Sequence, residues 1–270
     1  AGLPLARIGI TGLRGRGAAG WLMAPIRVFK AMLQARRIFQ QLRPGCVLSM
    51  GGYVAGPGGL MARLMGIPLL IHEQNAIPGL TNRLLRPLAE RVFGGFPGGL
   101  KGAVHSGNPV RVDIAALPPP LNRAEARTGP VRVLVVGGSQ GSAALGKIVP
   151  KALARIPESQ RPRVVHQAGR QLDGTLASYA ESAVAAEVVE FIDDMAAAWA
   201  DADLAICRSG ALTVAELCAA GVPAILVPFP FAVDDHQTVN ARFLVNAGAA
   251  WLIPESDLSP EGLAERLMRA

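Results

Sequence analysis

The chain has 270 residues, half of them apolar, with 31 glycines and 21 prolines. That composition is typical of an α/β protein with buried parallel strands, and it excludes an intrinsically disordered chain. The three cysteines, Cys46, Cys207 and Cys218, are widely spaced and form no C-x-x-C pair. The sequence therefore indicates reduced thiols, with neither a disulfide framework nor a zinc site. No apolar run reaches the roughly 18 to 20 residues that a membrane span needs.

The formal net charge of +7 is concentrated at the start of the chain, because residues 1–45 contain eight cations and no carboxylate. Within residues 18–43, which show helical spacing, the cations alternate with Trp21, Ile26 and Phe29. Nucleic-acid binding is disfavoured, because no recognition module or set of stacking aromatics is present. Two interpretations stay open: an amphipathic helix packed on the core, and a segment that contacts anionic lipid.

The first half of the chain alternates predicted strands and helices. Apolar runs predict strands over 46–50, 67–75 and 91–96, and helices over 60–66 and 82–88. GGYVAGPGGL (51–60) is predicted to form a glycine-rich loop after the first of these strands.

The second half repeats this alternation. Strands are predicted over 131–138, 163–169, 186–193, 204–210 and 223–229, and helices over 142–156, 194–201 and 211–221. Strands that alternate with helices at short spacing predict parallel sheets with right-handed crossovers. Because 116–130 is rich in proline and charge, we expect two doubly wound α/β domains that face each other across a cleft. Their expected bounds are 1–110, a linker region at 111–130, and 131–270.

The stretch GGSQGSAALGKI (137–148) nearly matches two nucleotide-binding patterns. A dinucleotide fingerprint needs glycine where Ser139 stands, and a P-loop needs a magnesium-binding hydroxyl where Ile148 stands. Glycines before a helix N-terminus still suit a phosphate group, although a tight turn without a ligand is an equally simple explanation. The same two interpretations apply to GGYVAGPGGL.

CRSGALTVAELCAAG (207–221) also joins a predicted strand to a predicted helix. One interpretation places a phosphate on the amides of Ala211, Leu212 and Thr213, with Glu216 accepting hydrogen bonds from ribose hydroxyls. The other is a capping box, since Thr213 and Glu216 are three residues apart. The sequence does not choose between them.

Two of the four histidines have suggestive positions. His72 ends an apolar strand in IHEQN, and His236 lies in DDHQTVN after a strand and a proline. Ligands bind at such strand ends in open α/β sheets. His105 and His166 are assigned structural roles. No H-E-x-x-H spacing is present, so we expect no metal site, and the D-x-D pattern at 201–203 is too short to carry weight.

Eight motifs together resemble one family closely. GLRGRG, GGYVAGPGGL, HEQNAIPGLTNRLL, GNPVR, GGSQGS, FIDDM, CRSGALTVAE and DDHQTVNA occur in the order and spacing of the MurG family, over nearly the whole chain. Members of that family transfer N-acetylglucosamine from its UDP donor to the undecaprenyl-linked muramyl-pentapeptide of cell-wall synthesis, which converts lipid I to lipid II.

The resemblance implies a GT-B fold with two Rossmann-like domains, and a transfer that inverts the anomeric centre. It also implies a peripheral protein on the cytoplasmic face of the bacterial inner membrane, with residues 14–37 against anionic lipid. No cofactor and no nucleic acid is implied, and whether a divalent cation assists stays open.

Site residues follow from the matching motifs. On the donor side the resemblance places uracil at the backbone of Ile192, the ribose hydroxyls on Glu216, the diphosphate on Ser139, Arg111 and the amides of Ala211, Leu212 and Thr213, and the sugar near Asn75, His236 and Gln237. On the acceptor side it places Gly51, Gly52, Tyr53, Gly58 and Gly59, with His72 as the general base.

Family members begin with a further glycine-rich loop, usually GGTGGH, and end with helices that return to the first domain. Neither is found in this sequence. We therefore expect a nearly complete donor site, a damaged acceptor site and slow turnover. The alternatives are a UDP-N-acetylglucosamine 2-epimerase, which needs no acceptor, and a non-catalytic module that binds UDP-sugar and docks on membranes.

Overall fold

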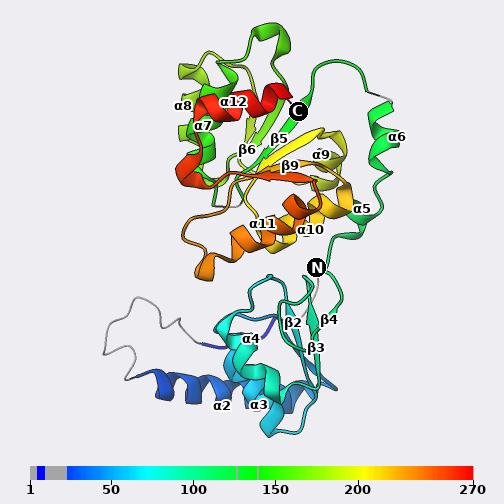
Figure 1. Cartoon of the computed structure of the whole chain (residues 1–270). Helices are drawn as coiled ribbons and strands as arrows, with labels where there is room; N and C mark the ends of the chain where they lie inside the picture. Colours follow the sequence, from blue (N-terminus) through cyan, green and yellow to red (C-terminus); the bar gives the residue numbers. More distant parts are fainter. Residues whose placement is uncertain (1–4, 10–22, 126, 139, 270) are drawn as a thin grey trace. The chain divides into compact units, whose positions relative to one another are not determined.

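A computed structural model describes residues 5–9, 23–125, 127–138 and 140–269 of the chain. The chain divides into two compact units, Ala1–Asn108 and Pro109–Ala270. Each unit contains one parallel sheet and the helices that pack around it (Figure 1). In the described part of the chain, no helix combines the length and the apolar character that crossing a membrane requires.

The first unit contains a four-stranded parallel sheet in the order β1-β2-β3-β4. Its strands are β1 (Val47–Ser49), β2 (Leu69–Glu73), β3 (Arg91–Gly94) and β4 (Val104–His105). Its helices are α2 (Ala24–Leu42), α3 (Ala55–Leu64), α4 (Leu80–Leu85) and the 3-10 turn η1 (Arg86–Leu88). Leu69 and Ile71 of β2 form the core with Leu85 and Leu100, as expected for a central parallel strand buried on both faces.

The second unit contains a six-stranded parallel sheet in the order β10-β9-β8-β5-β6-β7. The strands are β5 (Arg132–Val136), β6 (Arg163–Gln167), β7 (Glu187–Val189), β8 (Leu204–Cys207), β9 (Ala224–Leu226) and β10 (Ala250–Leu252). The chain runs outward from β5 to β7, returns to β8 beside β5, and runs outward again to β10. The order therefore reverses between β5 and β8, and ligands bind outside the carboxyl ends of the strands at such a point.

Two groups of helices cover this sheet (Figure 1). One group contains α7 (Ala143–Leu153), α8 (Leu172–Glu181) and α12 (Pro260–Arg269), and the other contains α5 (Val112–Ala115), α9 (Met195–Asp201), α10 (Ala211–Ala220) and α11 (His236–Asn246). Short 3-10 turns are η2 (Glu158–Gln160), η3 (Gly169–Gln171), η4 (Val233–Asp235) and η5 (Glu255–Asp257). The main core lies between β5 and the first group, where Val133 and Val135 contact Leu145, Val149 and Leu263.

Residues 111–130, expected to form a linker region, belong to the second unit. They contain α5 and α6 (Pro120–Glu125). Helix α5 packs on α9 and α10. Arg123 donates to the Trp199 carbonyl oxygen at 3.1 Å and to the Ala220 carbonyl oxygen. This segment is therefore fastened to the ends of two helices of its own unit.

Candidate functional site

The loop 137–142 joins β5 to α7 at the point where the strand order reverses. Gly141 has a φ of +73°, and a Cβ there would collide with a neighbouring carbonyl, so the turn requires glycine. The Gly138 amide donates to Gln167 Oε1 at 3.2 Å, and Gln167 Nε2 donates to the Gly138 carbonyl at 3.3 Å. Buried Gln167, at the end of β6, was not predicted to hold this loop. Ser139, a predicted diphosphate contact, lies outside the described residues.

Helix α7 begins directly after its N-cap, Ser142. The Ser142 hydroxyl oxygen accepts from the Leu145 amide at 3.3 Å and from Arg208 Nη2 at 2.8 Å. Lys147 therefore lies inside the helix, and the residues before it form helical turns in place of a phosphate loop. The apparent P-loop is a coincidence of sequence, as the missing hydroxyl at Ile148 indicated.

Helix α10 begins at Ala211 after the N-cap Gly210, whose φ of −60° and ψ of 147° are extended. Thr213 is thus the third helical residue and Glu216 the sixth. A capping box needs threonine at the N-cap itself, so that interpretation is wrong. The amides of Leu212 and Thr213 have no acceptor within the helix. They lie at the electropositive end of α10, at the carboxyl edge of β8.

Glu216 lies between donors from two other elements. Trp199 Nε1, on α9, donates to Glu216 Oε2 at 3.0 Å. Arg111 Nη2, at the N-cap of α5, is 3.8 Å from Glu216 Oε1. The Glu216 side chain is 21% exposed, whereas Trp199 is completely buried. The structure therefore brings Arg111, Glu216 and the first turn of α10 together, and it adds Trp199, which was not predicted.

Helix α11 begins with His236 and Gln237, both half-buried, directly after the loop that follows β9. Gln237 Oε1 accepts from the Phe229 amide at 2.9 Å, and His236 Nδ1 donates to the Val233 carbonyl at 2.7 Å. Just before them, Asp234 and Asp235 have φ values of +54° and +51°. Two successive non-glycine residues in the left-handed region are strained, and such strain is typical of functional loops.

Arg208, directly after β8, was not assigned a role from the sequence. Its Nη1 donates to the carbonyls of Val227 and Pro228 at 3.2 and 3.1 Å, and its guanidinium pairs with Glu255. The guanidinium also lies 5.6 Å from the ring centroid of Phe229. Arg208 therefore anchors the β9–α11 loop.

Ile192, predicted to contact uracil, lies between β7 and α9 and is half-buried. Backbone hydrogen bonds from Ala168 to Val189 (2.8 Å) and from Gly169 to Glu190 (3.0 Å) hold the preceding residues beside the end of β6. Two residues later, Asp194 caps α9. Ile192 therefore lies at the carboxyl edge of the sheet.

In the first unit, His72 occupies the penultimate position of β2 and is 8% exposed. Its Nε2 lies 3.0 Å from the Gly107 carbonyl oxygen, and its Nδ1 lies 3.3 Å from Gln74 Nε2. A carbonyl oxygen only accepts and an amide nitrogen only donates. The neutral ring therefore carries its proton on Nε2 and its lone pair on Nδ1.

The neighbouring Glu73 shapes the loop that follows β2. Its Oε1 accepts from the Asn75 amide at 3.1 Å, and its Oε2 accepts from the Gly79 amide at 3.0 Å and from Asn82 Nδ2 at 2.9 Å. Asn82 Oδ1 accepts from the Ser49 hydroxyl at 3.3 Å. This buried network links the ends of β1 and β2 to α4, and it places half-buried Asn75 at the carboxyl edge of the sheet.

The glycine-rich segment after β1 differs from the prediction, because α3 begins at Ala55 inside the expected loop. Gly51 and Gly52 do form the turn, with φ values of +82° and +77°, and Tyr53 beside them is exposed. Gly58 and Gly59 instead lie buried within α3. A Cβ on Gly59 would come within 2.6 Å of Leu85 Cδ1. Placing Gly59 in an open loop was wrong, because this glycine allows α3 to pack on α4.

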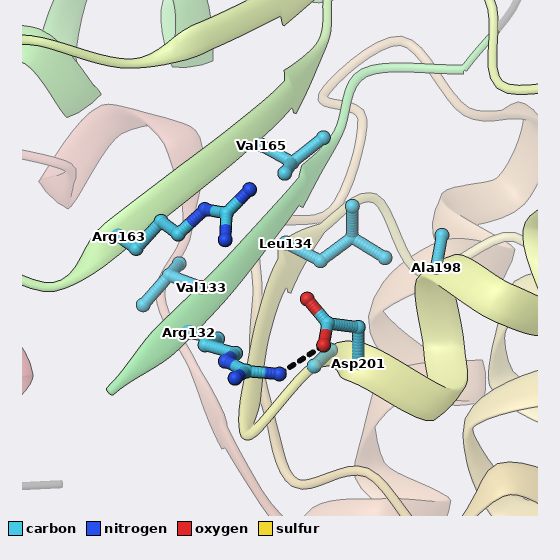
Figure 2. Close-up of a pocket in the computed structure, with 8 residues that line it drawn as sticks. Arg132, Val133, Leu134, Arg163, Val165, Ala198 and Asp201 are labelled. Carbon is cyan, nitrogen blue, oxygen red and sulfur yellow. Dashed lines mark hydrogen bonds and ion pairs between the residues drawn. The ribbon is translucent and has the colours of Figure 1, made fainter. Parts of the chain in front are cut away.

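The D-x-D pattern at 201–203 lies at the amino ends of the strands. Asp201 pairs with Arg132 beside a cavity of about 40 Å³ (Figure 2). Asp203 pairs with Arg127 and accepts from the Arg132 amide at 2.8 Å. Both carboxylates are thus engaged at the edge opposite the loops described above. Within the residues that the structure describes, no three His, Cys, Asp or Glu side chains form a group suited to a metal ion.

Residues 23–37 of the predicted membrane segment are described, and 14–22 lie outside the described residues. Helix α2 buries Ala24, Ala31 and Ala35. At 100° per residue, its opposite face presents an exposed set of Ile26, Phe29, Lys30, Leu33, Arg36 and Arg37. Helix α2 therefore packs on α3 through small residues and leaves large apolar and cationic side chains in solvent. This differs from the amphipathic helix considered above, whose large apolar side chains would pack on the core.

Comparisons with known proteins extend over both units. Residues 1–94 match the glycosyltransferase family 28 N-terminal domain, and residues 132–270 match the glycosyltransferase family 28 C-terminal domain. The chain belongs to glycosyltransferase family 28. A relative from Nitrosospira multiformis is 55% identical over 99% of this chain and 76% of its own length. It is named UDP-N-acetylglucosamine–N-acetylmuramyl-(pentapeptide) pyrophosphoryl-undecaprenol N-acetylglucosamine transferase.

Solved structures agree with this family assignment. MurG of Acinetobacter baumannii is 42% identical, with a TM-score of 0.82 over 99% of this chain and 76% of that chain. The chain is thus similar to the MurG branch of family 28, and the two parallel α/β units are those of a GT-B fold. A UDP-GlcNAc 2-epimerase of Methanocaldococcus jannaschii covers 90% of this chain and 74% of its own, with a TM-score of 0.56 and 16% identity. At that identity the likeness shows the fold alone.

Proposed function

We propose that this protein is an inverting glycosyltransferase that moves N-acetylglucosamine from UDP-N-acetylglucosamine to an undecaprenyl-linked muramyl-pentapeptide. The observation that supports it best is the second unit's strand-reversal point, where Glu216 and Arg111 meet the open N-terminus of α10. The names of relatives above 50% identity specify the sugar and the acceptor.

The donor side uses groups of the second unit. The Glu216 carboxylate accepts hydrogen bonds from the ribose hydroxyls, and the amides of Leu212 and Thr213 hold the diphosphate with Arg111. Ser139 and Ala211 complete that contact, and Ile192 meets the uracil. His236 and Gln237 hold the sugar, and Asn75 of the first unit is expected to contact it as well. As the bond to the leaving UDP breaks, the helix amides and the guanidinium stabilise the negative charge that develops on the diphosphate.

The acceptor side uses groups of the first unit. The muramyl hydroxyl oxygen attacks C1 of the donor sugar, the bond from C1 to the diphosphate oxygen breaks, and its electron pair leaves with UDP. His72 takes the hydroxyl proton. Because Nε2 already carries a proton, the accepting atom is Nδ1, and the Gln74 amide must turn aside. The turn at Gly51, Gly52 and Tyr53 contacts the acceptor diphosphate, supported by α3, which contains Gly58 and Gly59.

The exposed face of α2 attaches the protein to a membrane. Phe29 is 60% exposed and Ile26 48% exposed, and Lys30, Arg36 and Arg37 surround them. Apolar side chains enter the headgroup boundary while cations meet anionic phosphates, which gives peripheral binding. An acceptor that carries an undecaprenyl chain supports this attachment, and we infer a peripheral position on the cytoplasmic face of the bacterial inner membrane.

The test is transfer of radiolabelled N-acetylglucosamine to a lipid-linked muramyl-pentapeptide, with UDP release measured in parallel. We expect labelled lipid product and UDP in equal amounts. An epimerase would convert the donor to UDP-N-acetylmannosamine without any acceptor. A non-catalytic module would bind UDP by calorimetry but release none from the donor. Absence of both UDP binding and transfer would overturn the proposal.

A further inference from the structure

We propose that Trp199 is a positioning residue that orients the Glu216 carboxylate toward the donor's ribose. This inference rests on the proposed function, and it names a residue that the matched motifs do not assign. It starts from a single contact: the indole Nε1 of Trp199 donates to Glu216 Oε2 at 3.0 Å.

The chemistry of the two groups makes this contact directional. Tryptophan has one polar hydrogen and no acceptor. The Trp199 side chain is completely buried, so its ring orientation is fixed by packing. A hydrogen bond to a carboxylate is charge-assisted and stronger than one between neutral groups. The fixed indole therefore holds one oxygen of Glu216 and sets the plane of the carboxylate.

The other carboxylate oxygen faces a weaker partner. Arg111 Nη2 is 3.8 Å from Glu216 Oε1, and the Arg111 side chain is 46% exposed. That distance is beyond a hydrogen bond, and an exposed ion pair contributes little. Oε1 is thus the oxygen that ribose hydroxyls reach first, while Arg111 turns to the diphosphate. The two oxygens of Glu216 have separate tasks, one for the protein and one for the ligand.

Trp199 and Glu216 lie on different helices, so their contact depends on the alignment of α9 and α10. Arg123 bonds the Trp199 carbonyl at 3.1 Å and the Ala220 carbonyl at the end of α10. One side chain from α6 therefore ties together the two helices that carry the hydrogen bond. The Arg123 contacts therefore help to fix the Glu216 carboxylate before the ligand binds. A carboxylate that is already ordered lowers the entropic cost of binding.

The test compares UDP with 2′,3′-dideoxy-UDP, which lacks both ribose hydroxyls, by calorimetry on the whole chain. We expect Trp199→Phe to weaken UDP binding about tenfold, the effect of losing one hydrogen bond to a charged group. Binding of 2′,3′-dideoxy-UDP stays within twofold of wild type, because that ligand does not use Glu216. In turnover, KM for UDP-N-acetylglucosamine rises about tenfold while kcat changes less than twofold.

A second replacement keeps the shape of the ring, in case Trp199→Phe does not fold. Benzothienylalanine at position 199 replaces the indole N–H with sulphur and is expected to give the same loss of preference for UDP. Trp251→Phe, on β10 and partly exposed, is the matched control and leaves both affinities unchanged.

Three outcomes separate the claims. Equal weakening of both nucleotides in the Trp199 variants would mean that the residue is only structural, which overturns the inference. Unchanged UDP binding would overturn it as well. Failure of the wild-type chain to bind UDP would instead remove the proposed function on which the inference rests.

Discussion

Glu73 of the first unit and Glu216 of the second both lie at the carboxyl edge of their sheet, and the two carboxylates have opposite environments. Glu73 in the first unit is 3% exposed and accepts hydrogen bonds from Asn75, Gly79 and Asn82. Glu216 in the second unit is partly exposed, with one firm donor and one distant cation. A carboxylate whose lone pairs are filled by its own chain shapes a loop, whereas one with an unfilled oxygen is available to a ligand.

The largest expected effect is the loss of stability when Glu73 is replaced. Glu73→Leu removes the acceptor of the Asn75 and Gly79 amides. It also removes one of the two acceptors of the buried Asn82 amide group, which keeps only the His72 carbonyl. We expect the free energy of unfolding to fall by about 3 to 5 kcal/mol. Urea unfolding followed by circular dichroism measures it. Glu90→Leu, an exposed position in the same unit, is the control and changes the value by less than about 0.5 kcal/mol. Wild-type stability of Glu73→Leu would contradict a structural role for this carboxylate.

A second buried ionisable group has far fewer partners than Glu73. His166, the penultimate residue of β6, is completely buried, and its Nδ1 lies 3.1 Å from the Tyr179 hydroxyl. Burial lowers the pKa of His166 to about 4 and raises that of Tyr179. Between about pH 6.5 and pH 4 the unfolded chain binds a proton at this histidine and the folded chain does not. Its contribution to stability is therefore complete above pH 6.5 and is lost as the pH falls toward 4.

The predicted loss between pH 7.5 and pH 5 is about 2 kcal/mol from His166 alone. Urea unfolding at both pH values, in wild type and in His166→Asn, isolates it, because asparagine does not titrate. His105→Asn, at an exposed strand position, keeps the wild-type pH dependence. If His166→Asn lost as much stability between pH 7.5 and pH 5 as wild type does, the buried histidine would not be the source of that loss.

The smallest effect concerns the surface of the first unit. Phe29→Ser on α2 is expected to weaken binding to vesicles that contain anionic lipid by about tenfold, since a buried aromatic side chain contributes about 1.5 to 3 kcal/mol. Vesicle sedimentation measures it. Leu176→Ser, at an exposed apolar position on α8 of the second unit, is the control and leaves binding unchanged. Raised salt weakens wild-type binding, because the flanking cations are screened. Equal binding to neutral vesicles would contradict the proposal.

Much of the fold followed from the sequence. Apolar runs located β1, β2, β3, β5, β6, β7, β8 and β9, because the strands of parallel sheets are largely continuous apolar segments. Helices α8, α11 and α12 were missed. Helices α8 and α11 have weak amphipathic periodicity and form by packing on the sheet, whereas the clear amphipathic pattern of α12 could have predicted it. The start of α3 was missed for a related reason. A glycine-rich sequence favours a loop when it is considered alone. Gly59 is required inside α3 because Leu85 of α4 packs against it, and that contact is visible only in the structure.

The site was predictable where a motif ends a strand, and less so where a partner comes from elsewhere in the chain. Glu216 and the first turn of α10 stand next to each other in the sequence. Trp199 is 17 residues from its partner Glu216, and Gln167 is 29 residues from its partner Gly138. Nothing in the sequence around Trp199 or Gln167 distinguishes either residue from a core residue. The available signal was Gln167 itself, a polar residue at the carboxyl end of β6, comparable to His72 near the end of β2.

The contrast between the two glutamates assigns Glu216 to the donor nucleotide and Glu73 to its own loop. Calorimetric titration of UDP into wild type and Glu216→Gln tests this assignment most directly, with Glu181→Gln on the surface of α8 as the control. We expect Glu216→Gln to weaken UDP binding at least tenfold and the control to bind UDP as wild type does. Equal UDP affinity in Glu216→Gln and wild type would contradict it.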